Sequence, residues 1–251
     1  MPVFFLGAGF AANFWRTLWP LALILVLILI GMNVYFGINR RLFLLLERED
    51  WPALVDHLEH RVLQKSRYSP GLVRLLANSY LVMSDSAGVT ALENKAAIAK
   101  PALLEKNALV FGAARILGGD PEGAANFFAV RLEKARLRAR DKQWVHWYYG
   151  FSLLLARQFT QAAGEFKVLA ASSNDALITG LSVFFLSDTL LKYAEDPAEY
   201  RAIIAEGRER VIKALKTPAE WDREAARIET EVHAAILQKY INQAGTWLFD
   251  K

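Results

Sequence analysis

The sequence predicts an all-α protein in which helical hairpins follow one transmembrane helix. Three observations lead to this fold class. An uncharged apolar run of 22 residues lies near the N-terminus. Helix-start signals then recur along the rest of the chain, and the apolar residues between them are spaced by three and four positions, as on one face of a helix. We find no strand-like alternation of apolar and polar residues.

The composition is that of a folded chain. Of the 251 residues, 54% are hydrophobic, 22% are charged and none is cysteine. This excludes a disordered chain and a disulfide scaffold. The formal charge is +4, but residues 1–46 hold three arginines and no acid, so the remaining 205 residues carry 27 bases and 26 acids. A nearly neutral domain argues against nucleic acid as a partner, because nucleic acid binding needs a concentrated basic surface.

Residues 17–38 form the predicted transmembrane helix, and residues 1–16 form a short apolar segment before it. At about 1.5 Å per residue, the run reaches roughly 33 Å, enough to cross the hydrocarbon core of a bilayer. Arg16 precedes the run, Arg40 and Arg41 follow it, and aromatic residues lie near both ends. A soluble core helix of this length would show a polar stripe. A cleaved signal peptide would have a shorter apolar run and a small-residue cleavage site.

The side of the membrane that carries the rest of the chain is less sharply indicated. Arg16 and the α-amino group stand before the span, and Arg40, Arg41 and Arg48 stand after it. By the positive-inside rule this slightly favours a cytoplasmic C-terminal domain, although large domains translocate largely regardless of charge. An extracytoplasmic domain is the alternative, and the absence of cysteine fits either side.

Helix starts are marked by a capping side chain followed by proline. Such pairs occur at Ser69-Pro70, Asp120-Pro121, Asp196-Pro197 and Thr217-Pro218. The capping oxygen accepts a hydrogen bond from a free backbone N–H group of the first turn, and proline fits the first helical position. After residue 41 we therefore expect about ten short antiparallel helices.

Two segments repeat one pattern of small and aromatic residues. In the first, Gly112 precedes Ala124 by twelve positions and Phe128 by sixteen. The second has the same offsets, at Gly150, Ala162 and Phe166. The small residues let two helices approach closely, and the phenylalanine fills the gap towards the next helix pair.

This pattern resembles the tetratricopeptide repeat, which has a small residue on its first helix, an aromatic residue before the second helix, and then alanine and another aromatic residue. Gly150, Phe159, Ala162 and Phe166 match it. The small residues Ala77, Gly112 and Gly150 are 35 and 38 positions apart, against about 34 in an unmodified repeat. The resemblance implies a solenoid of stacked helical hairpins.

Partial units flank these two segments. Ala77 and Tyr80 fit the first helix of another unit, and an earlier unit, whose first helix continues from the membrane span, has its second helix at Trp51, Leu54 and Leu58. The departures from alanine are Leu54, Val89 and Lys192. The resemblance thus implies tetratricopeptide-like repeats over residues 43–171, followed by a further helical hairpin and a C-terminal capping helix over residues 172–251. A non-repetitive helical bundle is the alternative.

Stacked helical pairs bind partners on the concave face, which is lined by the first helix of each pair. The resemblance places on this face Arg74, Asn78, Leu109, Trp144, Trp147 and Phe151. Such a groove would be polar at one end and aromatic at the other, and it suits an amphipathic helix or an extended segment. Arg74 and Asn78 stand where the peptide-carboxylate-binding members carry a cation and an asparagine. The other clamp positions hold Val110, Trp144 and Tyr148. The alternative is that the aromatic residues are core.

No cofactor or catalytic motif is found, and we expect no enzyme. His57 and His60 lie three positions apart beside Glu59 and could together bind a metal, but a solvated polar helix face explains them equally well. The His-Glu-x-x-His spacing, a P-loop and a nucleophile elbow are all absent. The densest basic stretch runs from Arg131 to Lys142. Cations there complement the negative end of a helix dipole, with contact to anionic lipid or to an acidic partner surface as the alternative.

The sequence therefore predicts a membrane-anchored scaffold for protein–protein interaction, which recruits or holds partner proteins at a membrane. Similar membrane-tethered proteins in bacteria often serve the assembly of envelope complexes of the secretion, pilus or flagellar type, and this is what the resemblance implies. A structural subunit of a large membrane assembly is the first alternative. A metal-dependent enzyme is a more distant one.

Overall fold

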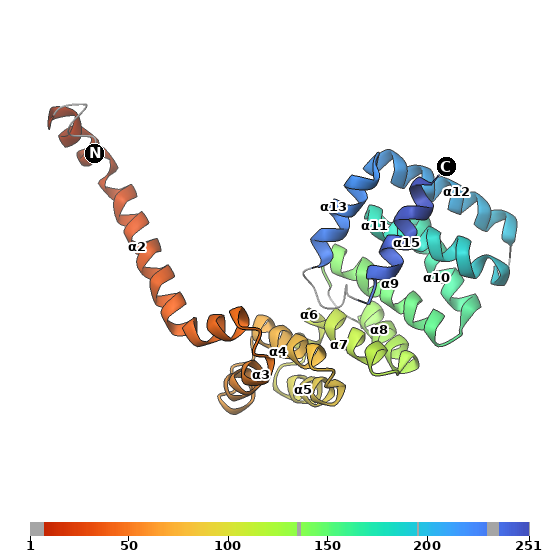
Figure 1. Ribbon diagram of the computed structural model, residues 1–251, viewed down its shortest axis with the longest axis horizontal. Helices are drawn as coiled ribbons and strands as arrows, with labels where there is room; N and C mark the ends of the chain where they lie inside the picture. The colour runs from red at the N-terminus through yellow and green to blue at the C-terminus, as the bar shows by residue number, and fades with distance from the viewer. Residues whose placement is uncertain (1–7, 135–136, 195, 230–235, 251) are drawn as a thin grey trace. The chain divides into compact units, whose positions relative to one another are not determined.

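The chain folds into helices. The computed structural model describes residues 8–134, 137–194, 196–229 and 236–250, and these contain helices and no strand (Figure 1). The predicted all-α class is confirmed. The chain divides into two compact units, Met1–His57 and Leu58–Lys251, and each is described by itself. Of the predicted segment 1–16, residues 1–7 lie outside the described part.

The first unit contains one long helix. Helix α2 runs without interruption over Ala8–Glu47 and so includes the whole predicted span of residues 17–38. It continues past the apolar run, as the repeat pattern requires for the first helix of a hairpin. Helix α3 then starts after a short turn and covers Trp51–Glu59, which crosses the division between the units.

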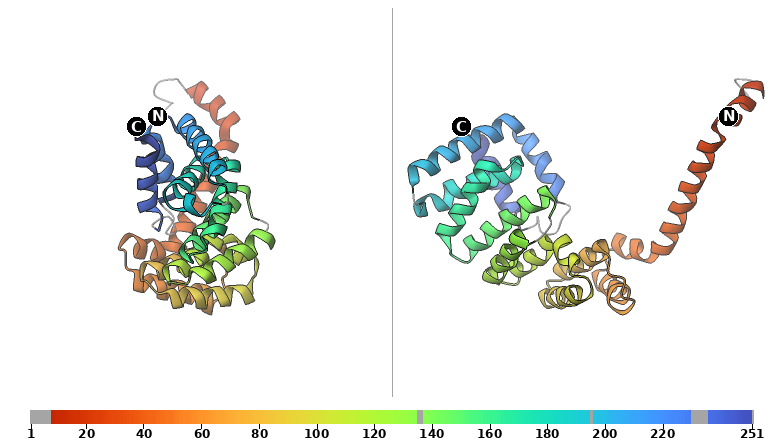
Figure 2. Two further views of the ribbon diagram at one scale, coloured as in Figure 1. Left: turned by 90° about the vertical axis from the view of Figure 1, so that its right-hand side faces the viewer. Right: turned by 180° about the vertical axis from the view of Figure 1, so that it is seen from behind.

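The second unit is a series of shorter helices. They are η1 (His60–Gln64, a π-helical turn), α4 (Pro70–Val82), α5 (Ser86–Ala99), α6 (Ala102–Lys106), α7 (Ala108–Leu117), α8 (Pro121–Lys134), α9 (Ala139–Leu155) and α10 (Phe159–Ser172). The chain goes on through α11 (Ala176–Phe185), the irregular turns η2 (Leu186–Leu190) and η3 (Leu191–Tyr193), α12 (Pro197–Leu215), α13 (Pro218–Glu229) and α15 (Gln238–Phe249). Successive helices from α7 to α12 lie side by side and alternate in direction in all three views (Figures 1 and 2).

All four predicted helix starts are confirmed. The helices begin at Pro70, Pro121, Pro197 and Pro218. In each case the preceding side chain accepts a hydrogen bond from a backbone N–H of the first turn. The acceptors are Ser69 Oγ, Asp120 Oδ1, Asp196 Oδ1 and Thr217 Oγ1. The capping oxygens fix where each helix begins because they satisfy donors that have no intrahelical partner.

Four interhelical turns share one backbone geometry. Each contains a residue with positive φ, at Glu49, Ser84, Gly119 and Arg157. The N–H of this residue bonds the carbonyl three positions back, and the next N–H bonds the carbonyl five positions back. This is the Schellman arrangement that closes a helix C-terminus. The turns lie 35, 35 and 38 positions apart, the last two being the spacings of the small residues in the sequence.

The repeated small–aromatic pairs meet in the structure. A Cβ atom at Gly112 would overlap the ring of Phe128, and a Cβ atom at Gly150 would lie 3.4 Å from Cζ of Phe166. Each glycine on a first helix therefore faces the phenylalanine sixteen positions later on the second helix. Close approach of α7 to α8 requires glycine at position 112, since the space that a methyl group needs is already filled.

The pattern changes after α11 because the partner of the small residue changes. A Cβ atom at Gly180 would lie 2.5 Å from Cζ3 of Trp221, which belongs to α13. Trp221 also packs against Gly245 of α15, and its indole N–H donates to the carbonyl of Ile241. One tryptophan thus joins three helices. This explains why Lys192, at the offset expected for alanine, is exposed and takes no part in the packing of α11.

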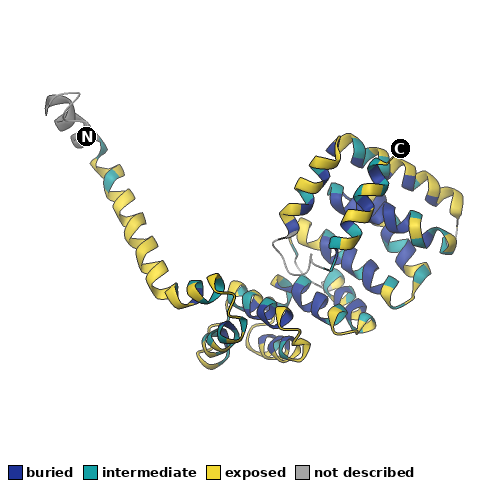
Figure 3. Cartoon of the chain, in the orientation of Figure 1, coloured by how far each residue is buried: buried dark blue, intermediate teal, exposed yellow. Residues whose placement is uncertain are grey.

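The core of the second unit is aromatic. The side chains that are almost completely buried include Trp147, Trp221, Tyr148, Phe111, Phe128, Phe151 and Phe166. In Figure 3 the dark-blue buried positions follow the facing sides of α7 to α15, whereas α2 is exposed along most of its length. Burial of large rings supplies most of the apolar area that stabilises such a domain.

Candidate membrane anchor and docking surface

Helix α2 presents an apolar surface that no described part of the chain covers. Within Leu18–Glu47 the most apolar window of 18 residues has a mean hydropathy of 2.6, and none of that window is buried. Large side chains such as Trp19, Leu27 and Ile38 are more than half exposed. Apolar area in water costs about 25 cal/mol per Å², so contact with another apolar phase would stabilise a helix of this composition. Its length is sufficient to cross a membrane.

The polar groups of this helix are arranged for an apolar environment. The Nδ2 atoms of Asn33 and Asn39 donate to the carbonyls of Leu29 and Tyr35, each at 2.9 Å. These bonds satisfy amide donors without an outside partner, which matters because an unpaired donor is costly in lipid. At the C-terminal end of the apolar run and just after it, the rings of Tyr35, Phe36 and Phe43 lie 5.3–6.1 Å apart. Aromatic rings favour the level of the head groups.

A second segment passes the same test of length and hydropathy but differs in burial. Ala176–Tyr193 has a mean hydropathy of 1.3, and 61% of it is buried inside the second unit. Its hydroxyl groups bond within the helix: Thr179 Oγ1 donates to Asp175 O and Ser182 Oγ donates to Ile178 O. We conclude that it is a core helix.

Three of the predicted groove residues are accessible. Arg74 on α4 is exposed, and its Nη2 donates to the carbonyl of Lys106 at 3.1 Å. Asn78 on α4 and Leu109 on α7 are half-buried. These three side chains lie on neighbouring first helices, since α4 packs against α7. The polar end of the predicted groove is therefore available to a partner.

The aromatic end of the predicted groove is core instead. Trp144, Trp147 and Phe151 are buried, so they offer no docking surface. The reason lies far along the chain. The ring of Tyr240, on α15, lies 5.5 Å from Phe151 and 5.1 Å from Phe185, and Phe185 in turn lies 5.9 Å from Trp147. Part of the aromatic surface is thus occupied by the C-terminal helix of the same chain.

Helix α15 is held in this position by a cation at its C-terminal end. Nη2 of Arg208, on α12, donates to the carbonyls of Trp247, Leu248 and Asp250 at 2.9–3.1 Å. The guanidinium also lies 5.1 Å from the ring centre of Trp247. Bonding to free carbonyls at a helix end is where a positive group is most favourable. The last turn of α15 is therefore bound to α12 by hydrogen bonds as well as by apolar packing.

Ionic groups join neighbouring helices. Glu93 on α5 is buried and binds Arg115 on α7 at 2.6 Å, with Arg131 on α8 at 3.9 Å. Arg131 lies over the ring of Phe127. Burial lowers the pKa of Arg131 to about 10, against a smaller opposing effect from Glu93. This cluster stands where the sixteen-residue offset from Ala77 would place a phenylalanine, so an ion pair replaces a ring there.

The histidines that the structure describes do not gather into a metal site. His60 Nδ1 lies 2.6 Å from Oε1 of Gln64, one turn along η1, and His57 has polar or charged interactions of its own. Within the described ranges, no group of three or more His, Asp or Glu side chains could hold a metal ion. His146 on α9 bonds Glu165 on α10 at 2.5 Å and so connects the two helices of one hairpin. Its geometry is that of a structural contact.

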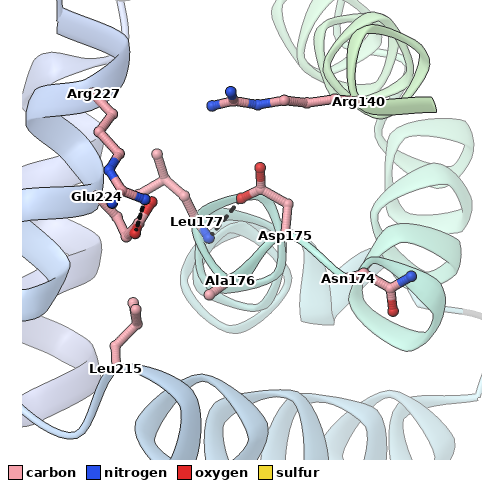
Figure 4. A pocket seen from close by; sticks show the side chains of 8 residues that line it. All are labelled: Arg140, Asn174, Asp175, Ala176, Leu177, Leu215, Glu224 and Arg227. Carbon is pink, nitrogen blue, oxygen red and sulfur yellow. Dashed lines mark hydrogen bonds and ion pairs between the residues drawn. The ribbon is translucent and has the colours of Figure 1, made fainter. Parts of the chain in front are cut away.

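A polar pocket of about 540 Å³ lies among α9, α11 and α13 (Figure 4). Its side chains are Arg140, Asn174, Asp175, Ala176, Leu177, Leu215, Glu224 and Arg227. Both carboxylates are engaged: Asp175 Oδ1 caps α11 by accepting from Leu177 N and Ile178 N, and Glu224 binds Arg227 at 2.5 Å. Figure 4 shows the Arg140 guanidinium extending into the pocket. Sequence reasoning missed this pocket because its walls come from four separate stretches.

The family of the chain follows from its second unit. A family model described as an uncharacterised Treponema protein matches residues 88–250, which is more than half of the chain. The chain belongs to this Treponema protein family. The matched region begins in α5 and ends just after α15, so it takes in the aromatic side chains of α7 to α11 and the C-terminal helix.

A relative from Treponema pallidum (strain Nichols), described as an uncharacterized protein, is similar over a longer stretch. It is 29% identical over 234 residues, which cover 90% of this chain and 74% of the relative. That alignment is longer than the family region and therefore includes part of α2. No solved structure matches the chain.

Proposed function

We propose that this Treponema family protein is a membrane-anchored scaffold in which α2 crosses the bilayer and the second unit holds partner proteins beside it. The observation that carries the proposal is the exposed apolar surface of α2. Covering that surface with lipid removes its cost in water, and no segment of the described chain does so. A cleaved signal sequence fits less well, because α2 continues as one helix through Arg40 and Arg41 to Glu47.

We further propose that the helical hairpins form a tetratricopeptide-like solenoid. Two observations support this arrangement. The same Schellman turn recurs at a spacing of 35 or 38 residues, and the glycine of each of two first helices faces the phenylalanine sixteen positions later. In a solenoid each hairpin contacts mainly its neighbours, so equal turns and equal small–aromatic contacts are what a stacked array needs.

The partner surface in this proposal is the accessible part of the first helices. Arg74, Asn78 and Leu109 lie there, on α4 and α7. A cation, an amide and an aliphatic side chain together suit an extended or helical protein segment that carries acceptors and an apolar residue. No bond is made or broken in this function. The protein would hold a component of an envelope complex, such as a secretion, pilus or flagellar type, near the membrane.

A structural role in a larger assembly is a second candidate, and one observation favours it. Val82, Leu117 and Leu155 are exposed apolar residues, and each lies two positions before the left-handed residue of its turn. Successive hairpins therefore place one aliphatic side chain at the same position along one end of the array. Such a row could contact a neighbouring subunit.

Photocrosslinking separates the two roles. A photoreactive amino acid at position 78 reports on the first helices, and one at position 117 reports on the turns. Position 94, exposed on α5, is the matched control. The scaffold proposal expects a crosslinked protein at position 78 and none at 94, in native membranes. A product at 117 alone would favour the structural subunit, and equal products at all three positions would overturn both. Sedimentation of the chain with membranes after alkaline carbonate washing tests the anchor.

A further inference from the structure

The two ends of the helix pairs in the second unit differ in charge. Because successive helices alternate in direction, the turns at residues 83–85, 118–120 and 156–158 lie at one end of the pairs. The connections at residues 64–70 and 99–107, and the described residues 134 and 137–139 of the next one, lie at the other. The turn end carries mainly acids, at Asp85, Asp120 and Glu122, with Arg157 as its cation.

The connection end carries mainly cations. We call basic edge the seven exposed cations that the structure describes in or within three residues of these connections, which are Lys65, Arg67, Lys100, Lys106, Arg138, Arg140 and Lys142. Arg61 and Arg131 also lie in this range but are half-buried, and the acids in it are Glu105, Glu133 and Asp141. The edge stops at α9, because the next connection carries Asp175 and no cation.

The cations of the basic edge are free to bind something outside the domain. All seven are exposed, and none forms a salt bridge with a described carboxylate. The cations elsewhere behave differently. Arg115 binds Glu93, Lys167 binds Glu199, and Arg208 binds the carbonyls at the end of α15. A set of exposed, unpaired like charges at one end of a domain repels itself unless an anionic surface lies against it.

An apolar side chain stands among these cations. Ile98, on the last turn of α5, is 87% exposed and lies two positions before Lys100. Val130, on α8 before the next connection, is 46% exposed. Cations with a protruding aliphatic side chain fit the bilayer interface, where the charges meet anionic head groups and the aliphatic group enters the acyl boundary. The phosphate backbone of a nucleic acid has no apolar region into which Ile98 could insert.

We propose that the basic edge binds the anionic lipid surface of the membrane in which α2 is anchored. This inference rests on the proposed anchoring, since 27 residues separate the end of the predicted span at residue 38 from Lys65. A tether that short keeps the domain at high effective concentration near the bilayer, so weak contacts suffice. The edge thereby lies on lipid and leaves the acidic turn end facing away from it.

Site-specific fluorescence on the full chain tests the contact. The sequence contains no cysteine, so a single engineered cysteine carries the only fluorescent label. Ala139→Cys lies in the basic edge between Arg138 and Arg140, and Ser86→Cys is the matched exposed site at the turn end. Each labelled chain is placed in nanodiscs of phosphatidylcholine alone or mixed with phosphatidylglycerol, with a quencher on the lipid head groups.

The expected result is that phosphatidylglycerol increases quenching at position 139 several-fold and leaves position 86 unchanged. Raising the ionic strength to about 1 M, where the Debye length is near 3 Å, should abolish the difference. Equal quenching at both positions in both lipids overturns the proposal. The proposal is also overturned if the chain binds DNA that carries as much negative charge as the lipid, while phosphatidylglycerol does not change the quenching at position 139.

A charge-reversal pair excludes a mere effect of net charge. Replacing Lys100, Arg138 and Arg140 by glutamate should remove the phosphatidylglycerol effect at position 139. Replacing Arg201, Lys213 and Arg223, exposed on α12 and α13, should leave it. Loss in both variants overturns the proposal. If the chain fails to enter nanodiscs, the proposed anchoring is wrong. The label is then measured with anionic vesicles added to the chain. Quenching at position 139 by these vesicles supports lipid binding by the basic edge, and no quenching overturns it.

Discussion

Two helical segments of this protein are long and apolar enough to cross a bilayer, yet they have different surroundings. Leu18–Glu47 is exposed along its apolar window, whereas Ala176–Tyr193 is 61% buried. A Cβ atom added at Gly31 or Gly37 of the first segment would meet nothing within 4 Å, but one added at Gly180 of the second would meet Trp221. Hydropathy therefore does not decide between a span and a core helix. The two kinds of helix are distinguished by whether residues from distant parts of the sequence pack against the helix.

The strongest test of this contrast removes the covering residue. Trp221→Ala takes a buried ring away from Gly180 and Gly245 and leaves the carbonyl of Ile241 without its indole donor. We expect the free energy of unfolding of the helical domain to fall by about 3–5 kcal/mol. Denaturant unfolding of the full chain in nanodiscs measures it. Trp19→Ala, at an exposed position of α2, is the control and should leave this free energy unchanged. A stable Trp221→Ala variant would mean that α11 needs no cover.

The second test puts a charge on the exposed helix. Val26 lies near the middle of the uncharged run and is half exposed. Val26→Asp should raise the cost of membrane insertion by about 3 kcal/mol, which is the cost of an acid at the centre of a span. Flotation on a density gradient should show loss from the membrane fraction, with the melting temperature of the helical domain unchanged. Val26→Leu is the matched control. Equal flotation of both variants would contradict a transmembrane α2.

The third test makes the same small change in both helices. In Gly180→Ala the new methyl group meets Trp221 at 2.5 Å, whereas in Gly31→Ala it meets nothing. Overpacking of this kind costs about 1–3 kcal/mol, so only the first variant should lower the free energy of unfolding. Gly164→Ala, in α10 with nothing within 4 Å, should instead stabilise by up to about 1 kcal/mol through helix propensity. Equal values for positions 180 and 31 would remove the contrast.

The smallest expected effect is a difference in alkaline sensitivity. Burial, and then the hydrogen bond to Glu59, raise the pKa of Tyr80 well above its usual value of 10.0, and burial also raises that of Tyr149. A pKa that is higher in the folded state gives stability that is complete below about pH 10 and is lost as the pH rises further. The helical domain should therefore weaken in alkali while α2 stays in the membrane.

Tyr80→Phe checks the origin of that sensitivity. It should cost about 1 kcal/mol at neutral pH through loss of the hydrogen bond to Glu59. Above about pH 10 its free energy of unfolding should fall less steeply than that of the parent protein, because one shifted phenol is gone. Tyr68→Phe, at a half-buried tyrosine on the connection before α4, is the control. Parallel pH profiles for all three proteins would assign the alkaline loss to other groups.

Features set by neighbouring residues could be predicted from the sequence. The capping pairs at Ser69, Asp120, Asp196 and Thr217 determine helix starts through contacts within one turn. The contact of Gly112 with Phe128 spans one hairpin, so a fixed offset of sixteen residues reveals it. The continuation of the helix from the apolar run to Glu47 was expected from the repeat resemblance, which needs a first helix before Trp51.

Features set by distant residues could not be predicted in this way. The partner of Gly180 is Trp221, which lies 41 positions later and follows no repeat offset. Trp147 and Phe151 have the same spacing on a helix whether they face a partner or a core. In the structure Phe185 lies against Trp147, and Tyr240 on α15, 89 positions after Phe151, lies against Phe151. The pocket around Arg140 has the same origin, since its walls are contributed by four stretches.

Because the same left-handed turn recurs, the segment between two turns has the same backbone geometry at both of its boundaries. Residues 84–118 begin at one Schellman turn and end immediately before the next, so both boundaries have the same backbone hydrogen bonds. Duplicating this segment in place would join equal geometries, and the closing helices around Trp221 would simply follow one hairpin later. We expect such an elongated chain to keep its helical content and to unfold at a similar temperature, measured by circular dichroism. Equal turns at both boundaries would thus allow the chain to be lengthened by one hairpin without a change at either end.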